Sequence, residues 1–194
     1  MMLQTSARIF LVRHGETQWN AAGIYQGALD SPLTDRGVAQ ARYCGEILAA
    51  HVGDIDHVFA SPLGRTQQTE AILRAGRDYP PTIWDNRLAE VTAGSWDGLS
   101  HIDIEAGWPG ALDGSDAFDW YFRSPDGESY AAAMARVTDW LRGCEGTVLA
   151  VSHGLLGRLI RGAYLGLPEA ETLRLPVPQD VVCKMENGAI EPLE

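Results

Sequence analysis

The chain has 194 residues, of which 45% are hydrophobic and 21% charged, the balance of a soluble globular protein rather than a disordered or membrane-spanning chain. Its length suits one domain, residues 1–194, with a sizeable core. The formal net charge of −11 makes the average surface repel polyanions, which excludes nucleic acid and anionic membranes as expected partners.

No segment approaches the roughly 20 apolar residues of a membrane span, and the start of the chain lacks a stretch of signal-peptide type. The three cysteines, Cys44, Cys144 and Cys183, are an odd number at wide spacing with no C-x-x-C pair. They indicate neither a disulfide framework nor a zinc site, and a reducing compartment fits them. We therefore expect a cytoplasmic protein.

The first half of the chain alternates strand and helix patterns. Ile9–Val12 is a continuous apolar run, as expected of a central strand buried on both faces. A helical pattern runs from Thr34 to about His51, a short strand occupies His57–Ser61, and a second helix runs from Thr66 to about Arg74. This alternation predicts a three-layer α/β/α sandwich with a mainly parallel sheet.

The regularity breaks between about Gly94 and Asp126, where glycines and prolines alternate with aromatic residues. The aromatic content predicts packing rather than disorder, and we expect an inserted lid. A helix returns at Ser129, and Val148–Val151 repeats the pattern of a buried strand. Near the end, Asn187-Gly188 between two apolar stretches is a hairpin signal.

Polar side chains follow three of the predicted strands. Arg13 and His14 follow the first strand, Arg65 follows the strand near residue 59, and His153 follows the strand near residue 149. Ligands of open α/β sheets bind outside the carboxyl ends of the strands. Two arginines and two histidines that converge there, with no obvious compensating cluster of acids, predict a preformed anion site.

Five motifs occur in order along nearly the whole chain: Leu11–Thr17 with Trp19-Asn20, Gln26-Gly27 and the stretch from Asp30 to Gly37; Ser61–Thr69; Glu90 with Gly94–Gly98; Asp126–Ser129; and Val151–Gly154. Together they strongly resemble the histidine phosphatase superfamily, also called the phosphoglycerate mutase-like family. The order and number of the motifs make this resemblance specific.

The resemblance implies a role for each strand-end residue. His14 would attack phosphorus and form a phosphohistidine, which water later hydrolyses. Arg13, Arg65 and His153 would surround the transferred phosphoryl group and stabilise its equatorial oxygens. Glu90 matches the position of the general acid that protonates the leaving group.

Four further residues match family positions that add neutral donors around the phosphate or the substrate: Thr17, Asn20, Gln26 and Gly27. The resemblance implies neither a metal nor a cofactor.

The segment 94–126 is expected to set substrate specificity. It is acidic and aromatic, with Arg123 its only basic residue, so we expect a substrate whose body is uncharged or apolar rather than one with several further anions. Asp113, Asp116 and Asp119 lie close in sequence, but no histidine lies among them. They predict a solvated acidic loop rather than a metal site.

We therefore expect a metal-independent, histidine acid phosphatase-like phosphomonoesterase that acts on a small phosphorylated substrate. The alternative within the family is a cofactor-dependent phosphoglycerate mutase, which carries a further basic segment after the acid. Here the stretch Glu90–His101 has no lysine or arginine, which favours the phosphatase. A catalytically silent binding module would have lost a central residue, yet all five are present. The oligomeric state is left open, a homodimer included.

Overall fold

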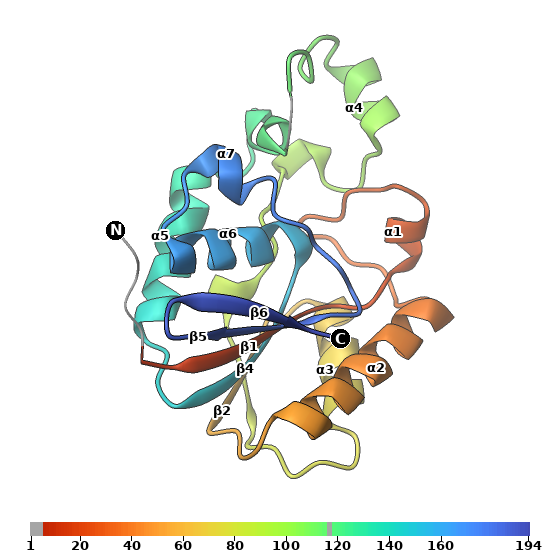
Figure 1. Ribbon diagram of the computed structural model, residues 1–194. Coiled ribbons are helices and arrows are strands. Elements are labelled where there is room, and N and C mark those ends of the chain that lie inside the picture. The colour runs from red at the N-terminus through yellow and green to blue at the C-terminus, as the bar shows by residue number, and fades with distance from the viewer. Residues whose placement is uncertain (1–5, 116–117) are drawn as a thin grey trace.

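The computed structural model describes residues 6–115 and 118–194, and these form a six-stranded sheet between two layers of helices (Figure 1). The strand order is β3-β2-β4-β1-β5-β6. The first four strands in this order are parallel to one another, and a C-terminal hairpin extends the sheet in antiparallel fashion. The predicted α/β fold with a mainly parallel sheet is confirmed. The strands are β1 (Arg8–Arg13), β2 (His57–Ala60), β3 (Thr82–Trp84), β4 (Thr147–Ser152), β5 (Val182–Glu186) and β6 (Ala189–Leu193).

Helices cover both faces of the sheet (Figure 1). One face carries α2 (Asp35–His51) and α3 (Gly64–Arg74), and the other carries α5 (Tyr130–Arg142) and α6 (Gly154–Leu165). None of the described helices is long and apolar enough to cross a bilayer.

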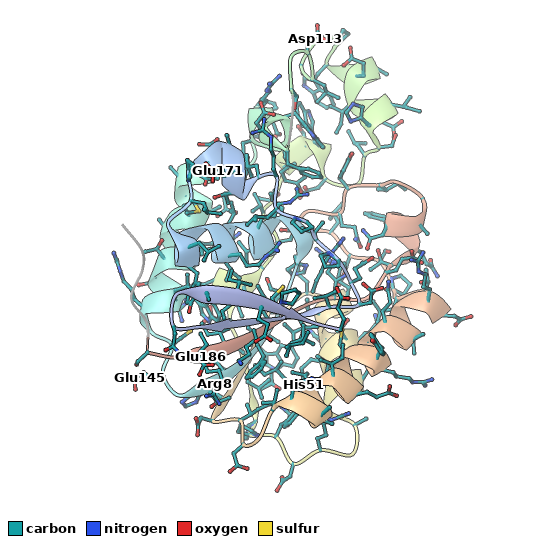
Figure 2. All side chains as sticks on the ribbon, in the orientation of Figure 1. Arg8, His51, Asp113, Glu145, Glu171 and Glu186 are labelled. Carbon is teal, nitrogen blue, oxygen red and sulfur yellow. The ribbon has the colours of Figure 1, made fainter. Side chains whose placement is uncertain are left out.

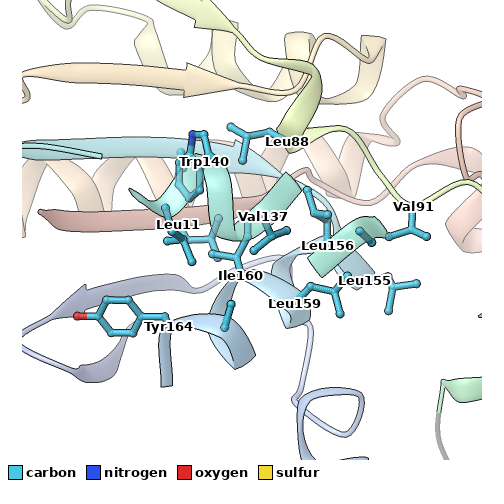
Figure 3. Close-up of a cluster of buried hydrophobic side chains, with 14 of the residues drawn as sticks. Leu11, Leu88, Val91, Val137, Trp140, Leu155, Leu156, Leu159, Ile160 and Tyr164 are labelled. Atoms are coloured by element: carbon cyan, nitrogen blue, oxygen red, sulfur yellow. The ribbon is translucent and has the colours of Figure 1, made fainter. Parts of the chain in front are cut away.

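The core is divided by the sheet into two clusters. Ile9 and Leu11 of β1 point into the larger cluster, beneath α5 and α6, part of which is drawn in Figure 3. Phe10 and Val12 point into the smaller cluster, beneath α2 and α3. Because successive side chains of a strand point to opposite faces, a strand that is covered on both sides reads as one continuous apolar run. The same alternation along β4 explains why both central strands could be predicted.

Local signals for helix starts and for the hairpin also proved correct. The hydroxyls of Thr34 and Ser129 accept hydrogen bonds from backbone N–H groups in the first turns of α2 and α5. Asn187 and Gly188, with φ of 51° and 76°, connect β5 to β6, as two-residue hairpins with left-handed turn residues do. At this end of the hairpin Nε of Arg8 lies 2.6 Å from Oε1 of Glu186 (Figure 2).

Several elements were not predicted. α6 was not predicted, and nearly all of its residues are buried, Arg158 and Arg161 included. β3 has three residues at one edge of the sheet, and α3 begins at Gly64, two residues earlier than predicted. The other unpredicted helices are the short α1 (Gln18–Ala21), α4 (His101–Gly107) and α7 (Glu169–Thr172).

The segment 94–126 packs through its aromatic residues, as predicted from their number. Trp96 and Trp120 are almost fully buried, and their rings lie 6.4 Å apart between centroids. Tyr25, from the body of the protein, meets the Trp120 ring edge-on at 4.8 Å. Among its described residues the segment forms α4 and two 3-10 turns, η2 (Gly94–Trp96) and η3 (Asp119–Arg123).

The acidic residues of this segment have separate surroundings. Asp119 forms an ion pair with Arg123 at 2.6 Å, and Asp113 is exposed at the top of the molecule (Figure 2). Asp116 lies outside the described residues. In the part of the chain that the structure describes, no three side chains of His, Cys, Asp or Glu lie close enough together to hold a metal ion.

Candidate active site

The pairing of β1, β4 and β2 places three strand ends side by side. Arg13 lies opposite Ser152 in the parallel register of β1 and β4, and the backbone N–H of His14 donates to the Ser152 carbonyl at 3.0 Å. The backbone N–H of Ser61 donates to the Val151 carbonyl at 3.0 Å, which aligns the end of β2 with that of β4. The polar residues that follow these strands therefore meet at one edge of the sheet.

A pocket of about 190 Å³ lies at this edge. It brings together most of the residues that the motifs singled out. Seven of the nine predicted site residues line it: Arg13, His14, Asn20, Gln26, Gly27, Arg65 and Glu90.

His14 is buried in this pocket. Its Nδ1 lies 2.8 Å from the Gly15 carbonyl oxygen, which can only accept, so Nδ1 carries the proton and the lone pair of Nε2 is free. Burial lowers the pKa of His14 well below its ordinary value, and the charges of Arg13 and Arg65 lower it further. The imidazole is therefore neutral at pH 7, the form that can act as a nucleophile.

His153 lies beside it, with 5.3 Å between the two ring centroids. Its Nδ1 accepts a hydrogen bond from Nε of Arg65 at 3.1 Å, so Nε2 carries the proton and donates to Oγ of Ser61 at 2.7 Å. Burial, followed by the charge of Arg65, lowers the pKa of His153 well below its ordinary value. The two hydrogen bonds hold the neutral ring in one orientation.

Arg65 connects separate parts of the site and is 1% exposed. Besides His153, its guanidinium contacts the carbonyls of Leu29 at 2.6 Å and Gly27 at 2.9 Å, and Oδ1 of Asp30 at 3.1 Å. The sequence shows no obvious cluster of acids to compensate the cations, and the structure places a single carboxylate, that of Asp30, against Arg65. Asp30 comes from a distant loop, which folds back against the start of α3 and also accepts the backbone N–H of Arg65.

Arg13 presents a buried donor to the pocket. Its Nη1 donates to the Val177 carbonyl, while its Nε has no acceptor among the described residues. Burial lowers the pKa of Arg13 to about 10, against the opposing effect of the Glu90 carboxylate. A buried donor without a partner costs about 1–3 kcal/mol, so a bound anion would be stabilised by this nitrogen. Gly154 leaves room beside it, because a Cβ there would lie 3.2 Å from Nε.

Glu90 reaches the pocket from the turn that follows η1 (Asn86–Leu88). Its Oε1 accepts the backbone N–H groups of Val91 at 3.0 Å and Leu156 at 2.9 Å, and its Oε2 accepts that of Leu155 at 3.1 Å. The first turn of a helix has N–H groups without intrahelical partners, and Glu90 satisfies two of them in α6. The carboxyl group is thereby held in one orientation beside the pocket.

The predicted neutral donors divide into two groups. Asn20, Gln26 and Gly27 line the pocket, and Oε1 of Gln26 is buried with no donor to it among the described residues. Thr17 does not line the pocket. Its hydroxyl accepts the N–H of Asn20 at 3.1 Å while Oδ1 of Asn20 accepts the N–H of Thr17 at 3.2 Å, a capping box that starts α1. Contact of Thr17 with substrate stays a prediction.

Arg158 also lines the pocket, although it belongs to none of the motifs. Its guanidinium carbon lies 4.3 Å from the centroid of the Phe118 ring, and its Nε donates to the Leu175 carbonyl at 2.6 Å. Burial lowers its pKa. The sequence does contain a signal for Arg158. It lies four positions after Gly154, so on a helix that begins at the site both residues lie on the same face.

The segment 175–179, which belongs to none of the motifs, contributes Val177 to the lining of the pocket. The carbonyls of the first three residues accept hydrogen bonds, in chain order, from Arg158, Arg161 and Arg13. The side chain of Gln179 donates to the carbonyl of His14 at 3.3 Å. The segment is therefore tied to both β1 and α6.

The remaining wall is aromatic and comes partly from the segment 94–126. Tyr25, Phe118 and Tyr121 line the pocket. The Tyr121 hydroxyl donates to the Val91 carbonyl at 2.9 Å, and burial raises its pKa well above the ordinary value. This wall is suited to contact the body of a substrate rather than its phosphoryl group.

Comparisons with known proteins agree with this arrangement. A family model described as the histidine phosphatase superfamily (branch 1) matches residues 9–189. The protein named "Probable phosphoglycerate mutase GpmB" of Enterobacter sp. (strain 638) is 41% identical over 180 residues, which cover 87% of this chain and 79% of that protein.

Solved structures share the fold over most of their length. Bacillus stearothermophilus YhfR has a TM-score of 0.81 and 29% identity, with 96% of this chain and 95% of that chain covered. The alpha-ribazole phosphatase from Shigella flexneri has a TM-score of 0.78 and 26% identity, with 96% and 95% covered. The mycobacterial glucosyl-3-phosphoglycerate phosphatase has a TM-score of 0.76 and 29% identity, with 91% and 90% covered. By its sequence match and by the residues gathered at its strand ends, this chain belongs to the histidine phosphatase superfamily.

Proposed function

We propose that the protein is a metal-independent phosphatase that hydrolyses a small phosphomonoester through a phosphohistidine on His14. The observation that carries this proposal is the buried, neutral imidazole of His14, whose Nδ1 is occupied by the Gly15 carbonyl and whose free Nε2 belongs to a pocket with Arg13 and Arg65. A neutral nucleophile beside cations is what attack on an anionic phosphoryl group requires.

In the first step Nε2 of His14 bonds to phosphorus while the bond from phosphorus to the ester oxygen breaks. Arg13 and Arg65 offset the charge on the equatorial oxygens, and His153, whose two ring nitrogens bond to Arg65 and Ser61, holds Arg65 in position. Glu90 gives its proton to the departing alkoxide.

In the second step water attacks the phosphorus of the phosphohistidine. The Glu90 carboxylate takes a proton from this water, and the bond from phosphorus to His14 breaks. Inorganic phosphate leaves, and both side chains regain their starting forms. The names of two compared structures, an alpha-ribazole phosphatase and a glucosyl-3-phosphoglycerate phosphatase, support hydrolysis of small phosphorylated molecules.

A cofactor-dependent phosphoglycerate mutase is the second candidate, favoured by the name of the curated relative GpmB. Such an enzyme would return the phosphoryl group from His14 to a substrate hydroxyl instead of to water. The absence of lysine and arginine from the stretch Glu90–His101 supports the phosphatase.

The test is release of phosphate from p-nitrophenyl phosphate in excess EDTA by the native protein, by His14→Ala and by His51→Ala. His51 is exposed at the far end of α2 and serves as the matched control (Figure 2). We expect activity that survives EDTA, is retained in His51→Ala and falls about a thousandfold or more in His14→Ala.

Activity that EDTA abolishes, or that His14→Ala retains, would contradict the proposal. A native protein that releases no phosphate but interconverts phosphoglycerates would establish the mutase instead.

A further inference from the structure

Asn20 lines the pocket, and the steps of the proposed reaction give its side chain no task. An amide side chain carries an acceptor oxygen on one side and an NH₂ donor group on the other. Asn20 can therefore act as a neutral donor to a phosphoryl group only if Nδ2, and not Oδ1, is available to the pocket. The contacts of Asn20 outside the pocket decide which of the two atoms is available.

Two partners with fixed roles determine how the Asn20 amide is turned. The backbone N–H of Thr17 can only donate, so the atom of Asn20 that lies 3.2 Å from it is Oδ1. The carbonyl oxygen of His14 can only accept, so the atom of Gln179 that lies 3.3 Å from it is Nε2. The second proton of this Nε2 is donated to Oδ1 of Asn20 at 3.1 Å. Two donors thus occupy both lone pairs of Oδ1.

Nδ2 of Asn20 is the polar atom that remains for a ligand. Among the described residues it has no hydrogen-bond acceptor, and Asn20 lines the pocket together with Arg13 and His14. An anion bound there supplies the acceptor oxygen that Nδ2 lacks. Hydrogen bonds to charged groups are stronger than those between neutral groups, so the orientation of this one amide affects how tightly the anion is held.

Gln179 does not line the pocket and belongs to none of the motifs. It reaches Asn20 from the segment 175–179, which three arginine side chains tie to β1 and α6 and in which two prolines restrict the backbone. Since its Nε2 also bonds to the carbonyl of His14, the same amide group contacts both residues. Gln179 therefore fixes the position of Asn20 relative to the proposed nucleophile.

We propose that Gln179 is a positioning residue that acts through Asn20 and directs Nδ2 of Asn20 at the phosphoryl group beside His14. The proposal rests on the proposed function, because it assumes that the pocket holds a phosphoryl group. Without Gln179, only the N–H of Thr17 would hold Oδ1, and the amide could rotate about χ2. Nδ2 would then face the phosphoryl group for only part of the time.

The test is a double-variant cycle on the binding of inorganic phosphate, measured by calorimetry. The proteins are the native protein, Gln179→Met, Asn20→Ala and the double variant Gln179→Met/Asn20→Ala. Methionine has nearly the length of glutamine but no N–H group. Gln67→Met is the matched control, because Gln67 is exposed, donates from Nε2 to the Pro62 carbonyl at 2.7 Å and does not line the pocket.

We expect Asn20→Ala to weaken phosphate binding about 10- to 100-fold, the range of a hydrogen bond to a charged group. Gln179→Met should weaken it about 3- to 30-fold in the native background but less than twofold in the Asn20→Ala background, because its effect passes through Asn20. Gln67→Met should bind as the native protein does. A dissociation constant does not depend on the fraction of folded molecules, so a variant that is merely less stable does not imitate this pattern.

Nuclear magnetic resonance observes the Asn20 amide directly. Its side-chain N–H signals are identified by their loss in Asn20→Ala. Saturating phosphate should shift these signals in the native protein and shift them less than half as far in Gln179→Met.

Unchanged phosphate binding in Gln179→Met, or the same loss with and without Asn20, would overturn the positioning role. Release of phosphate from p-nitrophenyl phosphate by the same proteins separates this result from the proposed function. Turnover that requires His14, without the coupling between Gln179 and Asn20, contradicts the positioning role alone. The expected coupling without turnover contradicts the phosphatase alone, and a native protein that neither binds phosphate nor hydrolyses the ester contradicts both.

Discussion

His14 and His153 are both buried and neutral, yet their hydrogen bonds select opposite tautomers. Nδ1 of His14 donates to a carbonyl and leaves Nε2 free, whereas Nδ1 of His153 accepts from Arg65 and its Nε2 donates to Ser61. The first arrangement suits a residue that must bond to phosphorus. The second suits a residue that holds its neighbours in position.

Replacement of Glu90 tests its proposed role as the general acid. Glu90→Gln cannot donate a proton to the leaving group, so we expect an alkyl phosphate, whose alkoxide is a poor leaving group, to react about 10²- to 10⁴-fold more slowly. p-Nitrophenyl phosphate should lose less than tenfold, because its phenolate departs without a proton. The measurement is kcat for both esters, with Glu46→Gln, an exposed acid on α2, as the control. Equal losses for the two esters would remove Glu90 from the acid role.

The loop that carries His14 packs closely against α2 because glycines at two positions leave room for the two backbones. A Cβ on Gly37 would lie 2.0 Å from the Glu16 carbonyl oxygen, and one on Gly15 would lie 2.2 Å from the Gly37 carbonyl oxygen. Real Cβ atoms do not approach oxygen so closely. The first turn of α2 therefore contacts the loop that carries His14 directly, backbone against backbone.

Gly37→Ala should lower the free energy of unfolding by about 1–3 kcal/mol, as expected for overpacking. The sign is informative, because alanine in a helix would otherwise stabilise it by up to about 1 kcal/mol. Urea unfolding measures the change, and Gly53→Ala is the control, since nothing lies within 4 Å of its added Cβ. If Gly37→Ala unfolds at the same urea concentration as the native protein, or at a higher one, the loop and α2 can separate at no cost in free energy.

For the whole molecule, the two buried histidines make stability depend on pH. Each binds a proton near pH 6.5 in the unfolded chain, while in the folded protein both pKa values lie well below that. Their contribution is complete above pH 6.5 and is lost as pH falls below it, because only the unfolded chain then takes up protons. The slope is about 1.4 kcal/mol per pH unit for each histidine.

Urea unfolding at pH 7.5 and pH 5.5 checks this dependence. The native protein should be less stable at pH 5.5, His14→Asn should show a smaller loss, and the double variant His14→Asn/His153→Gln a smaller one still. An identical loss in all three proteins would mean that the two histidines are not the source of the pH dependence.

Much of the fold could be predicted from the sequence alone. Continuous apolar runs identified β1 and β4 as central strands, and the capping residues Thr34 and Ser129 located the starts of α2 and α5. Because parallel strands end at the same edge of a sheet, the motif residues that follow them, Arg13 and His14 among them, had to meet. These features depend on local periodicity, on capping and on one topological rule, all of which are visible along the chain.

Only the tertiary structure decided the rest. The Asp30–Arg65 pair and the contact of Arg158 with Phe118 join residues 35 and 40 positions apart. α6 is buried almost all round, its two arginines included, and such burial of charged residues does not follow from residue types. The tautomers of the histidines depend on which carbonyl, hydroxyl or guanidinium the fold brings to each ring nitrogen. These properties arise from contacts between distant segments, and residue types alone do not specify such contacts.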